Sequence, residues 1–185
     1  MSTPAMKVRM TVKNMDMLFP IVHSELIQKA STLTGLWSEY IYSIIRQESS
    51  FDPLSQSPAD AIGLMQILPS IAKVQGKKHH IIFKTKEDLF DPAINISIGA
   101  YHLRDYWDLF EGRFILSTAG YNASPEAVKT WMRTRSNPDP LIFIEDIPYE
   151  ETRNYVKLVM RNFINYLRLT TKEENISFPE WCLAL

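Results

Sequence analysis

Apolar residues recur three and four positions apart along most of this 185-residue chain, and polar or turn-forming residues separate the segments that carry them. This spacing predicts amphipathic helices. The predicted helices cover residues 19–31, 36–49, 92–112, 114–121 and 152–169, with others after Gly63, near Pro69 and from Ser124. We therefore predict an all-α fold, or a mainly helical α+β fold at most.

Capping and turn-forming residues mark where the predicted helices begin. Asp91 and Ser124 each precede a proline, and this order places an N-cap residue before a proline at the first helical position. Residues 51–60 contain two prolines and several Ser and Asp residues, which predicts a loop. Only residues 141–144 have a strand-like composition. The last predicted helix carries one inward stripe of Tyr155, Val156, Val159, Phe163 and Tyr166.

Glu48 lies in the last turn of a predicted helix, on its apolar face. The residues seven, four and three positions before it are Ile41, Ile44 and Ile45, so the carboxylate shares a face with three isoleucines. Partial burial disfavours the ionised form and raises the pKa of a carboxyl group, as a general acid requires near neutral pH. The alternative is a surface glutamate on a frayed helix end.

Composition and charge exclude several classes of protein. A hydrophobic content of 45% in 185 residues suits one domain with a sizeable core. The net charge of −1 gives no electrostatic case for a nucleic-acid-binding protein. The single cysteine, Cys182, excludes an internal disulfide. Residues 77–80, Lys-Lys-His-His, could form a metal or anion patch, but a polar loop is the better interpretation because further His or Cys ligands are missing nearby.

The chain contains no apolar run of the ~20 residues needed to span a bilayer. Residues 1–19 also lack the continuous apolar core of a secretory signal. We expect residues 1–185 to form a single domain, with residues 1–18 as an extension. This domain is expected to be the C-terminal catalytic part of a longer precursor.

Three ordered motifs resemble those of a known family. The first is Glu-Ser-Ser-Phe-Asp-Pro at 48–53, followed by Ser57 and by Gly-Leu-Met-Gln-Ile at 63–67. The others are Ala-Gly-Tyr-Asn-Ala-Ser-Pro at 119–125 and Ile-Pro-Tyr-Glu-Glu-Thr-Arg-Asn-Tyr-Val at 147–156. Together they resemble the signature of the soluble lytic transglycosylases, goose-lysozyme-like enzymes that cleave the glycan strands of bacterial peptidoglycan.

The resemblance implies a lysozyme-like fold and a mechanism with one carboxylate. Such enzymes cleave the β-1,4 bond between N-acetylmuramic acid and N-acetylglucosamine, and they close a 1,6-anhydro ring without using water. Glu48 would act first as the acid and then as the base. Glycoside hydrolysis usually takes two carboxylates, but Asp52 precedes a proline and is more simply a turn former.

The resemblance also implies a substrate, a location and the absence of a cofactor. Peptidoglycan glycan strands would be the partner, at a periplasmic or cell-envelope site. We expect no metal, no other cofactor and no nucleic acid, and a monomeric chain.

The segment after Glu48 supplies three candidate substrate-binding residues. Ser57 matches a family serine that orients the acid or contacts the N-acetyl group, although it could be an ordinary loop serine. Met65 and Gln66 match a cleft-lining pair, and the Gln66 amide suits hydrogen bonds to sugar hydroxyls.

Later segments supply three more candidates. The resemblance implies that the Tyr121 hydroxyl points at the catalytic carboxylate, that Asn122 ties down the turn, and that Glu151 faces the cleft. Packing of the tyrosine ring and a helix-dipole role for the glutamate are the plain alternatives. The family pattern has alanine where this chain has Gly120 and glycine where it has Ser124; a positive φ at Ser124 would strain the turn.

Two other functions remain open. A true muramidase on the same scaffold would use water in place of the 6-hydroxyl group. A non-catalytic glycan-binding or secretion-apparatus scaffold could keep the cleft, but intact Glu48 and Tyr121 argue against it.

Overall fold

The structure is a computed structural model that describes residues 18–135, 137–173 and 176–185. Its helical elements are α2 Ser24–Thr34, α3 Ser38–Glu48, α4 Pro69–His79, η1 Lys86–Phe90, α5 Pro92–Leu109, α6 Phe114–Asn122, α7 Pro125–Thr134, α8 Pro140–Glu145, α9 Glu150–Thr171 and η2 Glu180–Leu183. The expected extension over residues 1–18 lies outside the described residues, apart from Leu18.

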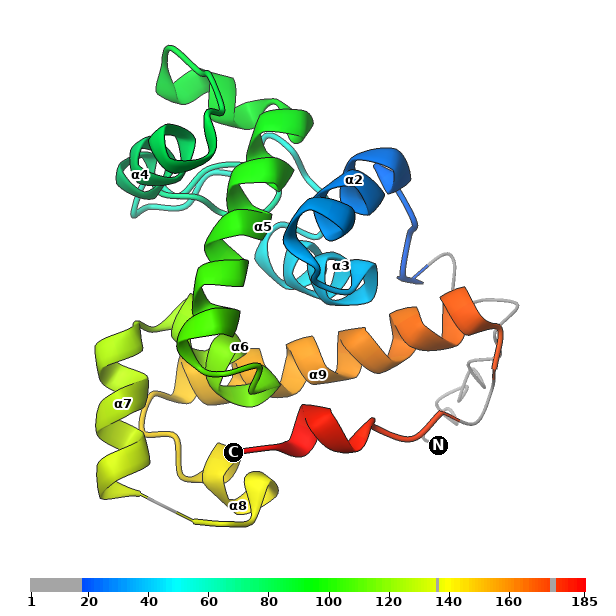
Figure 1. Ribbon diagram of the computed structural model, residues 1–185, viewed down its shortest axis with the longest axis vertical. Coiled ribbons are helices and arrows are strands. Elements are labelled where there is room, and N and C mark those ends of the chain that lie inside the picture. Colours follow the sequence, from blue (N-terminus) through cyan, green and yellow to red (C-terminus); the bar gives the residue numbers. More distant parts are fainter. Residues whose placement is uncertain (1–17, 136, 174–175) are drawn as a thin grey trace, which may run out of the picture.

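The longest helix, α9, lies across the middle of the molecule (Figure 1). In this view α2 to α5 lie on one side of α9, while α8 and the C-terminal segment lie on the other. The most extensive helix contacts are those of α3 with α9 and of α2 with α5. Helix α3, which ends at Glu48, is therefore held against α9.

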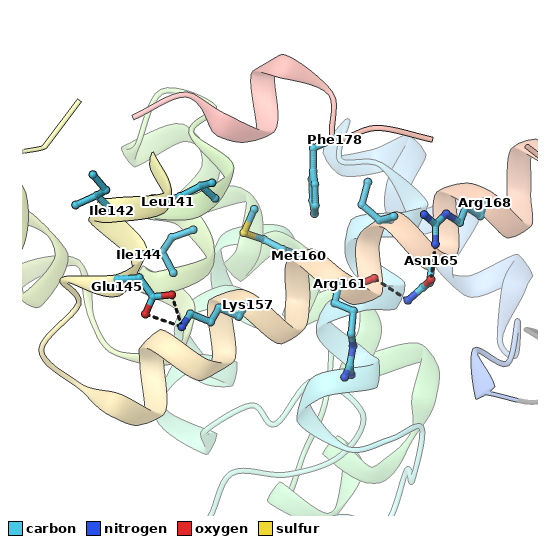
Figure 2. Close-up of a pocket in the computed structure, with 11 residues that line it drawn as sticks. Leu141, Ile142, Ile144, Glu145, Lys157, Met160, Arg161, Asn165, Arg168 and Phe178 are labelled. Carbon is cyan, nitrogen blue, oxygen red and sulfur yellow. Dashed lines mark hydrogen bonds and ion pairs between the residues drawn. The ribbon is translucent and has the colours of Figure 1, made fainter. Parts of the chain in front are cut away.

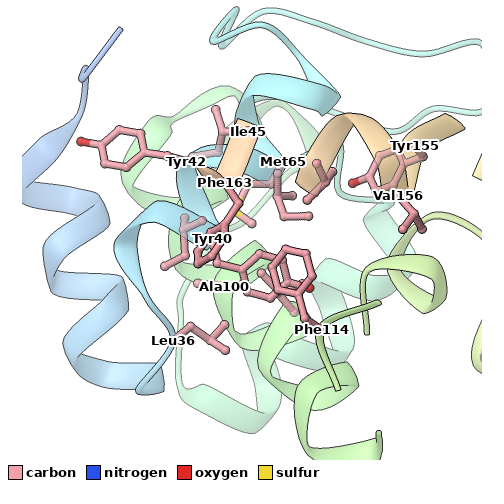
Figure 3. Packing of buried hydrophobic residues seen from close by; sticks show 14 of the residues in the cluster. Leu36, Tyr40, Tyr42, Ile45, Met65, Ala100, Phe114, Tyr155, Val156 and Phe163 are labelled. Carbon is pink, nitrogen blue, oxygen red and sulfur yellow. The ribbon is translucent and has the colours of Figure 1, made fainter. Parts of the chain in front are cut away.

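The centre of the core is aromatic and aliphatic. Figure 3 shows Tyr40, Phe114 and Phe163 packed together from three different helices, with ring centroids of Tyr40 and Phe114 4.5 Å apart. Ile41, Ile44 and Ile45 are each completely buried. The amphipathic pattern of the helix that carries Glu48 is thus confirmed.

Most predicted helices and both predicted caps are present. The Asp91 side chain accepts hydrogen bonds from the backbone N–H groups of Ala93 and Ile94 at the start of α5. The Ser124 hydroxyl accepts one from Ala127 N at the start of α7. Ser124 has φ of −177°, which is extended backbone, so the strain considered for this position does not arise.

Two local predictions of secondary structure are wrong. Residues after Gly63 form turns, with isolated bridges that pair Ile62 with Gln56 and with Ile67. Gly63 and Gln66 both have positive φ, which a right-handed helix does not allow. Residues 141–144 belong to helix α8, since Asp139 caps the helix and accepts from the N–H groups of residues 141 and 142. Their strand-like composition is overridden by this cap.

The Lys-Lys-His-His run is not a loop. Residues 77–79 form the last turn of α4, and His80 ends the helix in the left-handed conformation. Lys77, Lys78 and His79 lie at the C-terminal end of α4, where the helix dipole is negative. Basic side chains at this end stabilise a helix. Cys182, the single cysteine of the chain, is buried. None of the helices among residues 18–135, 137–173 and 176–185 is long and apolar enough to cross a membrane.

A completely buried asparagine holds the segment after Gly63 in place. Asn95 of α5 accepts a hydrogen bond from Met65 N at 2.8 Å and donates from Nδ2 to the carbonyls of Ile62 and Leu89. Gly63 itself has φ of +76°, and a Cβ at this position would collide with Asn95 and with the Leu89 carbonyl. The backbone of this segment is therefore fixed from α5, not by its own helix propensity.

We expect Asn95→Ala to lower the free energy of unfolding by roughly 3 kcal/mol, because it leaves several buried backbone groups without partners. Chemical denaturation of the variant measures this loss. Ser97→Ala is the matched control on the same helix, since the Ser97 hydroxyl only bonds back to Ala93 O. Equal losses in the two variants would contradict the role given to Asn95.

Candidate active site

Glu48 is the last residue of α3, and a tyrosine from α9 binds it. The Tyr155 hydroxyl donates a hydrogen bond of 2.5 Å to Glu48 Oε1. Tyr155 is buried, and Glu48 is partly exposed. Glu48 shares one face of α3 with three completely buried isoleucines. This bond joins the two helices that make the largest contact in the molecule.

Burial decides the charge state of Glu48. The pKa of the carboxyl group is raised from 4.5 to about 7, and burial is the largest of the causes. The hydrogen bond from Tyr155 acts in the opposite direction because it stabilises the carboxylate, and the negative charge of Glu151 raises the pKa further. The group is thus poised between its acid and base forms near neutral pH, as the isoleucine face predicted.

Tyr121 lies near Glu48 but does not bond to it. Its hydroxyl donates to the carbonyl oxygen of Met65 at 2.9 Å, so the expected direct contact with the carboxylate is replaced by that of Tyr155. Burial raises the pKa of both tyrosines well above 10, and the charge of Glu48 adds to this in each case. Glu48 therefore has two neutral tyrosines as neighbours.

The end of α3 is tied to the segment after Gly63 through Ser49. The Ser49 hydroxyl donates to Leu64 O at 2.9 Å and accepts from Phe51 N. Ser50 and Phe51 both have positive φ, which turns the chain sharply away after Glu48. Further along this loop, Ser57 accepts a hydrogen bond from Ala61 N, so its hydroxyl closes a turn.

Met65 and Gln66 have different positions. The Met65 side chain is completely buried and packs against Gly99, where a Cβ would collide with it, so the expected cleft-lining role does not apply to this side chain. Gln66 is partly exposed with φ of +50°, and its Nε2 donates to the carbonyls of Ser55 and Gly63. The Gln66 amide nitrogen thus secures the loop, while Oε1 is the end left to accept other hydrogen bonds.

The second and third motifs meet at one contact. Asn122, at the end of α6, accepts a hydrogen bond of 2.7 Å from the Thr152 hydroxyl in the first turn of α9. Asn122 therefore links the end of α6 to the start of α9, and this is a contact other than the backbone turn that was expected for it. Glu151, beside Thr152, is exposed and lies close enough to Glu48 to influence its pKa.

The departure at Gly120 has a steric reason. A Cβ at this position would collide with Phe110 and press on the ring of Tyr106. Glycine therefore suits this chain because α5 and α6 approach closely here.

Asp52, which was considered as a second carboxylate, and Asp60, the next acidic residue along the chain, are both engaged elsewhere. Asp52 accepts from Leu54 N and forms a turn, as predicted. Asp60 bonds to Lys86 and Gln56. In the part of the chain that the structure describes, no group of three His, Cys, Asp or Glu side chains could hold a metal ion.

Tyr155 was placed on the inward stripe of the last helix but not in the site. Its position within the third motif was the available signal, since that motif otherwise supplied Glu151. Helical periodicity alone could not show that the hydroxyl, and not only the ring, is used.

The fold and the site define a class of protein, a helical domain in which a partly buried glutamate has two tyrosines as close neighbours. The sequence profile described as "Transglycosylase SLT domain" matches residues 25–144. The chain therefore belongs to this family of transglycosylase domains, and its fold is lysozyme-like.

Curated relatives agree with this assignment. The soluble lytic murein transglycosylase of Escherichia coli (strain K12) is 36% identical over 167 residues, which are 88% of this chain and 26% of the relative. The enzyme of the same name from Salmonella typhimurium is 34% identical over 88% of this chain and 26% of the relative. The chain thus spans about a quarter of the length of these relatives.

Solved structures are similar as well. The 70-kDa soluble lytic transglycosylase SLT70 from Escherichia coli matches with a TM-score of 0.84 and 33% identity, over 92% of this chain and 28% of that one. An inactive mutant of the lytic transglycosylase Slt from Pseudomonas aeruginosa matches with a TM-score of 0.83 and 31% identity, over the same shares.

Two substitutions should move the pKa of Glu48 in opposite directions. Tyr155→Phe removes a hydrogen bond to the carboxylate and should raise the pKa above its value of about 7. Glu151→Gln removes a neighbouring negative charge and should lower it. Carbon-13 NMR titration of the Glu48 carboxyl carbon measures both, and shifts of the same sign would refute this electrostatic description.

Proposed function

We propose that this chain is the catalytic domain of a lytic transglycosylase that cleaves the β-1,4 bond between N-acetylmuramic acid and N-acetylglucosamine in peptidoglycan. The observation that carries the proposal is Glu48, a partly buried carboxyl group with a pKa of about 7, bonded to Tyr155. Support also comes from relatives whose names are those of murein transglycosylases.

The proposed reaction uses Glu48 twice. The protonated carboxyl group first gives its proton to the glycosidic oxygen, while the N-acetyl group of the substrate stabilises the anomeric carbon. The carboxylate then takes the proton of the 6-hydroxyl group of the muramic acid, which closes on the anomeric carbon as a 1,6-anhydro ring. A pKa near the working pH allows one group to perform both steps.

Tyr155 and Glu151 would balance these two steps. The Tyr155 hydroxyl stabilises the carboxylate that remains after the first proton transfer and fixes the orientation of Oε1. The negative charge of Glu151 favours the protonated form that begins the cycle. Tyr155 is thus a positioning residue for the acid.

The other candidate residues would bind the substrate or shape its site. Gln66 Oε1 and the Glu151 carboxylate are the groups available for sugar or peptide groups. Ser57 would act chiefly through the turn that it closes, and Tyr121 through the Met65 carbonyl that it binds. Asn122 would act through its bond to Thr152 on α9. Met65 would contribute through its backbone and the position it gives Tyr121, not through its buried side chain.

A muramidase is the alternative that one observation favours. Glu151 lies within electrostatic reach of Glu48 and is exposed, so it could serve as a base for water. The transglycosylase is preferred because family relatives share that activity in their names. The substrate would place the domain in the periplasm or cell envelope.

Products from purified peptidoglycan sacculi distinguish the two reactions. We expect anhydromuropeptides about 18 Da lighter than hydrolysis products, because no water is added when the 6-hydroxyl closes the ring. Mass spectrometry of the digest measures this difference, with Glu48→Gln as the inactive control. Reducing-end products alone would indicate a muramidase, and no release by the wild-type chain would indicate a non-catalytic domain.

A further inference from the structure

A cluster of lysines and apolar side chains lies where the chain leaves α4 towards α5. One surface depression of about 340 Å³ is lined there by three lysines and three apolar residues, Lys73, Lys77, Lys84, Ile81, Ile82 and Phe83. We call these residues the lysine patch. Figure 1 shows α4 and the segment between α4 and α5 at one end of the molecule, with α8 at the other. None of the patch residues belongs to the proposed catalytic site.

The segment after α4 folds back onto that helix and leaves Ile82 exposed. Ile81 N donates a hydrogen bond to Gly76 O at 2.9 Å, and a Cβ at Gly76 would lie 2.8 Å from the ring of Phe83. Ile81 and Phe83 are half-buried, whereas Ile82 between them is 85% exposed, more than any other large apolar side chain that the structure describes. The segment is therefore anchored on both sides of a projecting isoleucine.

The lysines give the patch a positive charge in a chain whose net charge is −1. Lys73 and Lys77 lie one turn apart on α4, and Lys84 follows the anchored segment. All three are exposed, and none of them forms an ion pair within the described part of the chain. The neighbouring Lys78 and Lys86 are paired with aspartates.

Acidic residues neutralise little of this charge. No acidic side chain lines the depression. Asp88 is close to Lys84, but its carboxylate accepts hydrogen bonds from the backbone N–H groups of Lys84 and Thr85, at 2.6 and 3.0 Å. Asp88 thus offsets part of the charge at Lys84 and leaves the charges of Lys73 and Lys77 in place.

Charge and exposure together indicate the chemistry of the ligand. Lysines at a protein surface are attracted to the phosphates of an anionic bilayer. An isoleucine that is 85% exposed gains free energy only when it enters an apolar medium, which a bilayer offers next to its phosphates. A soluble anionic polymer offers the charges without the apolar medium. The position at one end of the molecule also lets the patch meet a flat surface (Figure 1).

We propose that the lysine patch binds the surface of an anionic phospholipid bilayer. Ile82 enters the apolar edge of the bilayer, and Lys73, Lys77 and Lys84 contact the phosphates around it. This inference goes beyond the proposed cleavage reaction and does not depend on Glu48. A domain held in this way acts on glycan strands that lie next to a membrane.

Flotation with lipid vesicles tests the proposal. The whole chain should bind vesicles that contain phosphatidylglycerol and not vesicles of phosphatidylcholine alone, and salt should weaken the binding by screening. Lys73→Gln and Lys77→Gln should each lower the partition coefficient about fivefold. Ile82→Ser should lower it about tenfold, because the variant no longer buries an apolar side chain in the bilayer.

Two control variants separate this patch from general surface properties. Leu141→Ser is the apolar control, because Leu141 is 60% exposed and lines the groove between α8 and α9 that Figure 2 shows. Lys129→Gln on α7 is the charge control, since Lys129 is exposed and lies outside the patch. Neither variant should change the partition coefficient.

A fluorescent label measures insertion directly. An environment-sensitive dye attached to Ile82→Cys should shift its emission to shorter wavelength with phosphatidylglycerol vesicles, because the dye leaves water. Cys182 is completely buried, so the folded chain is labelled at the introduced thiol. The same dye at Leu141→Cys should show no shift.

Other outcomes would overturn the proposal. Equal binding to the two kinds of vesicle, no binding to either, or binding that the patch variants leave unchanged would remove the patch as a membrane site. Binding that needs the lysines but shows no dye shift at position 82 would exclude insertion. Binding of soluble polyglutamate that needs the same lysines, without vesicle binding, would assign the patch to an acidic protein partner.

Discussion

The hydrogen bond between Tyr155 and Glu48 is the interaction on which the site depends. It joins the end of α3 to the start of α9, the two helices with the largest contact in the molecule. The isoleucines behind Glu48 exclude water, so the carboxyl group is difficult to ionise. The hydrogen bond that Tyr155 donates stabilises the carboxylate and lowers the free-energy cost of ionisation. The two effects oppose each other, and a pKa near neutrality is the result.

The rest of the site is positioned from outside its own sequence segment. The turn that contains Met65 and Gln66 has little local preference for its conformation, since Gly63 and Gln66 both have positive φ. Asn95 on α5 satisfies its backbone, and Ser49 ties it to the end of α3. Tyr121 then reaches the Met65 carbonyl from α6, so three helices converge on one turn.

Sequence reasoning succeeded where one local signal decides the structure. Helical periodicity, together with two N-cap residues that each precede a proline, located most helices. The spacing of the isoleucines located the partly buried acid, Glu48. It failed where a distant partner decides: the turn after Gly63 depends on Asn95, thirty residues along the chain from Met65. For the same reason the resemblance directed attention to Tyr121, while the contact with Glu48 is made by Tyr155, 107 residues away.

The most direct test of the central claim is the pH dependence of stability in the wild-type chain and in Glu48→Gln. Below pH 4.5 the carboxyl group is protonated in both folded and unfolded states, so burial imposes no penalty there. As the pH rises from 4.5 to about 7, the unfolded chain ionises more readily than the folded one, and wild-type stability falls relative to the variant. We predict a relative loss of up to about 3 kcal/mol by pH 8, measured by chemical denaturation. A difference that does not change with pH, or a wild-type chain that gains stability over this range, would contradict the account.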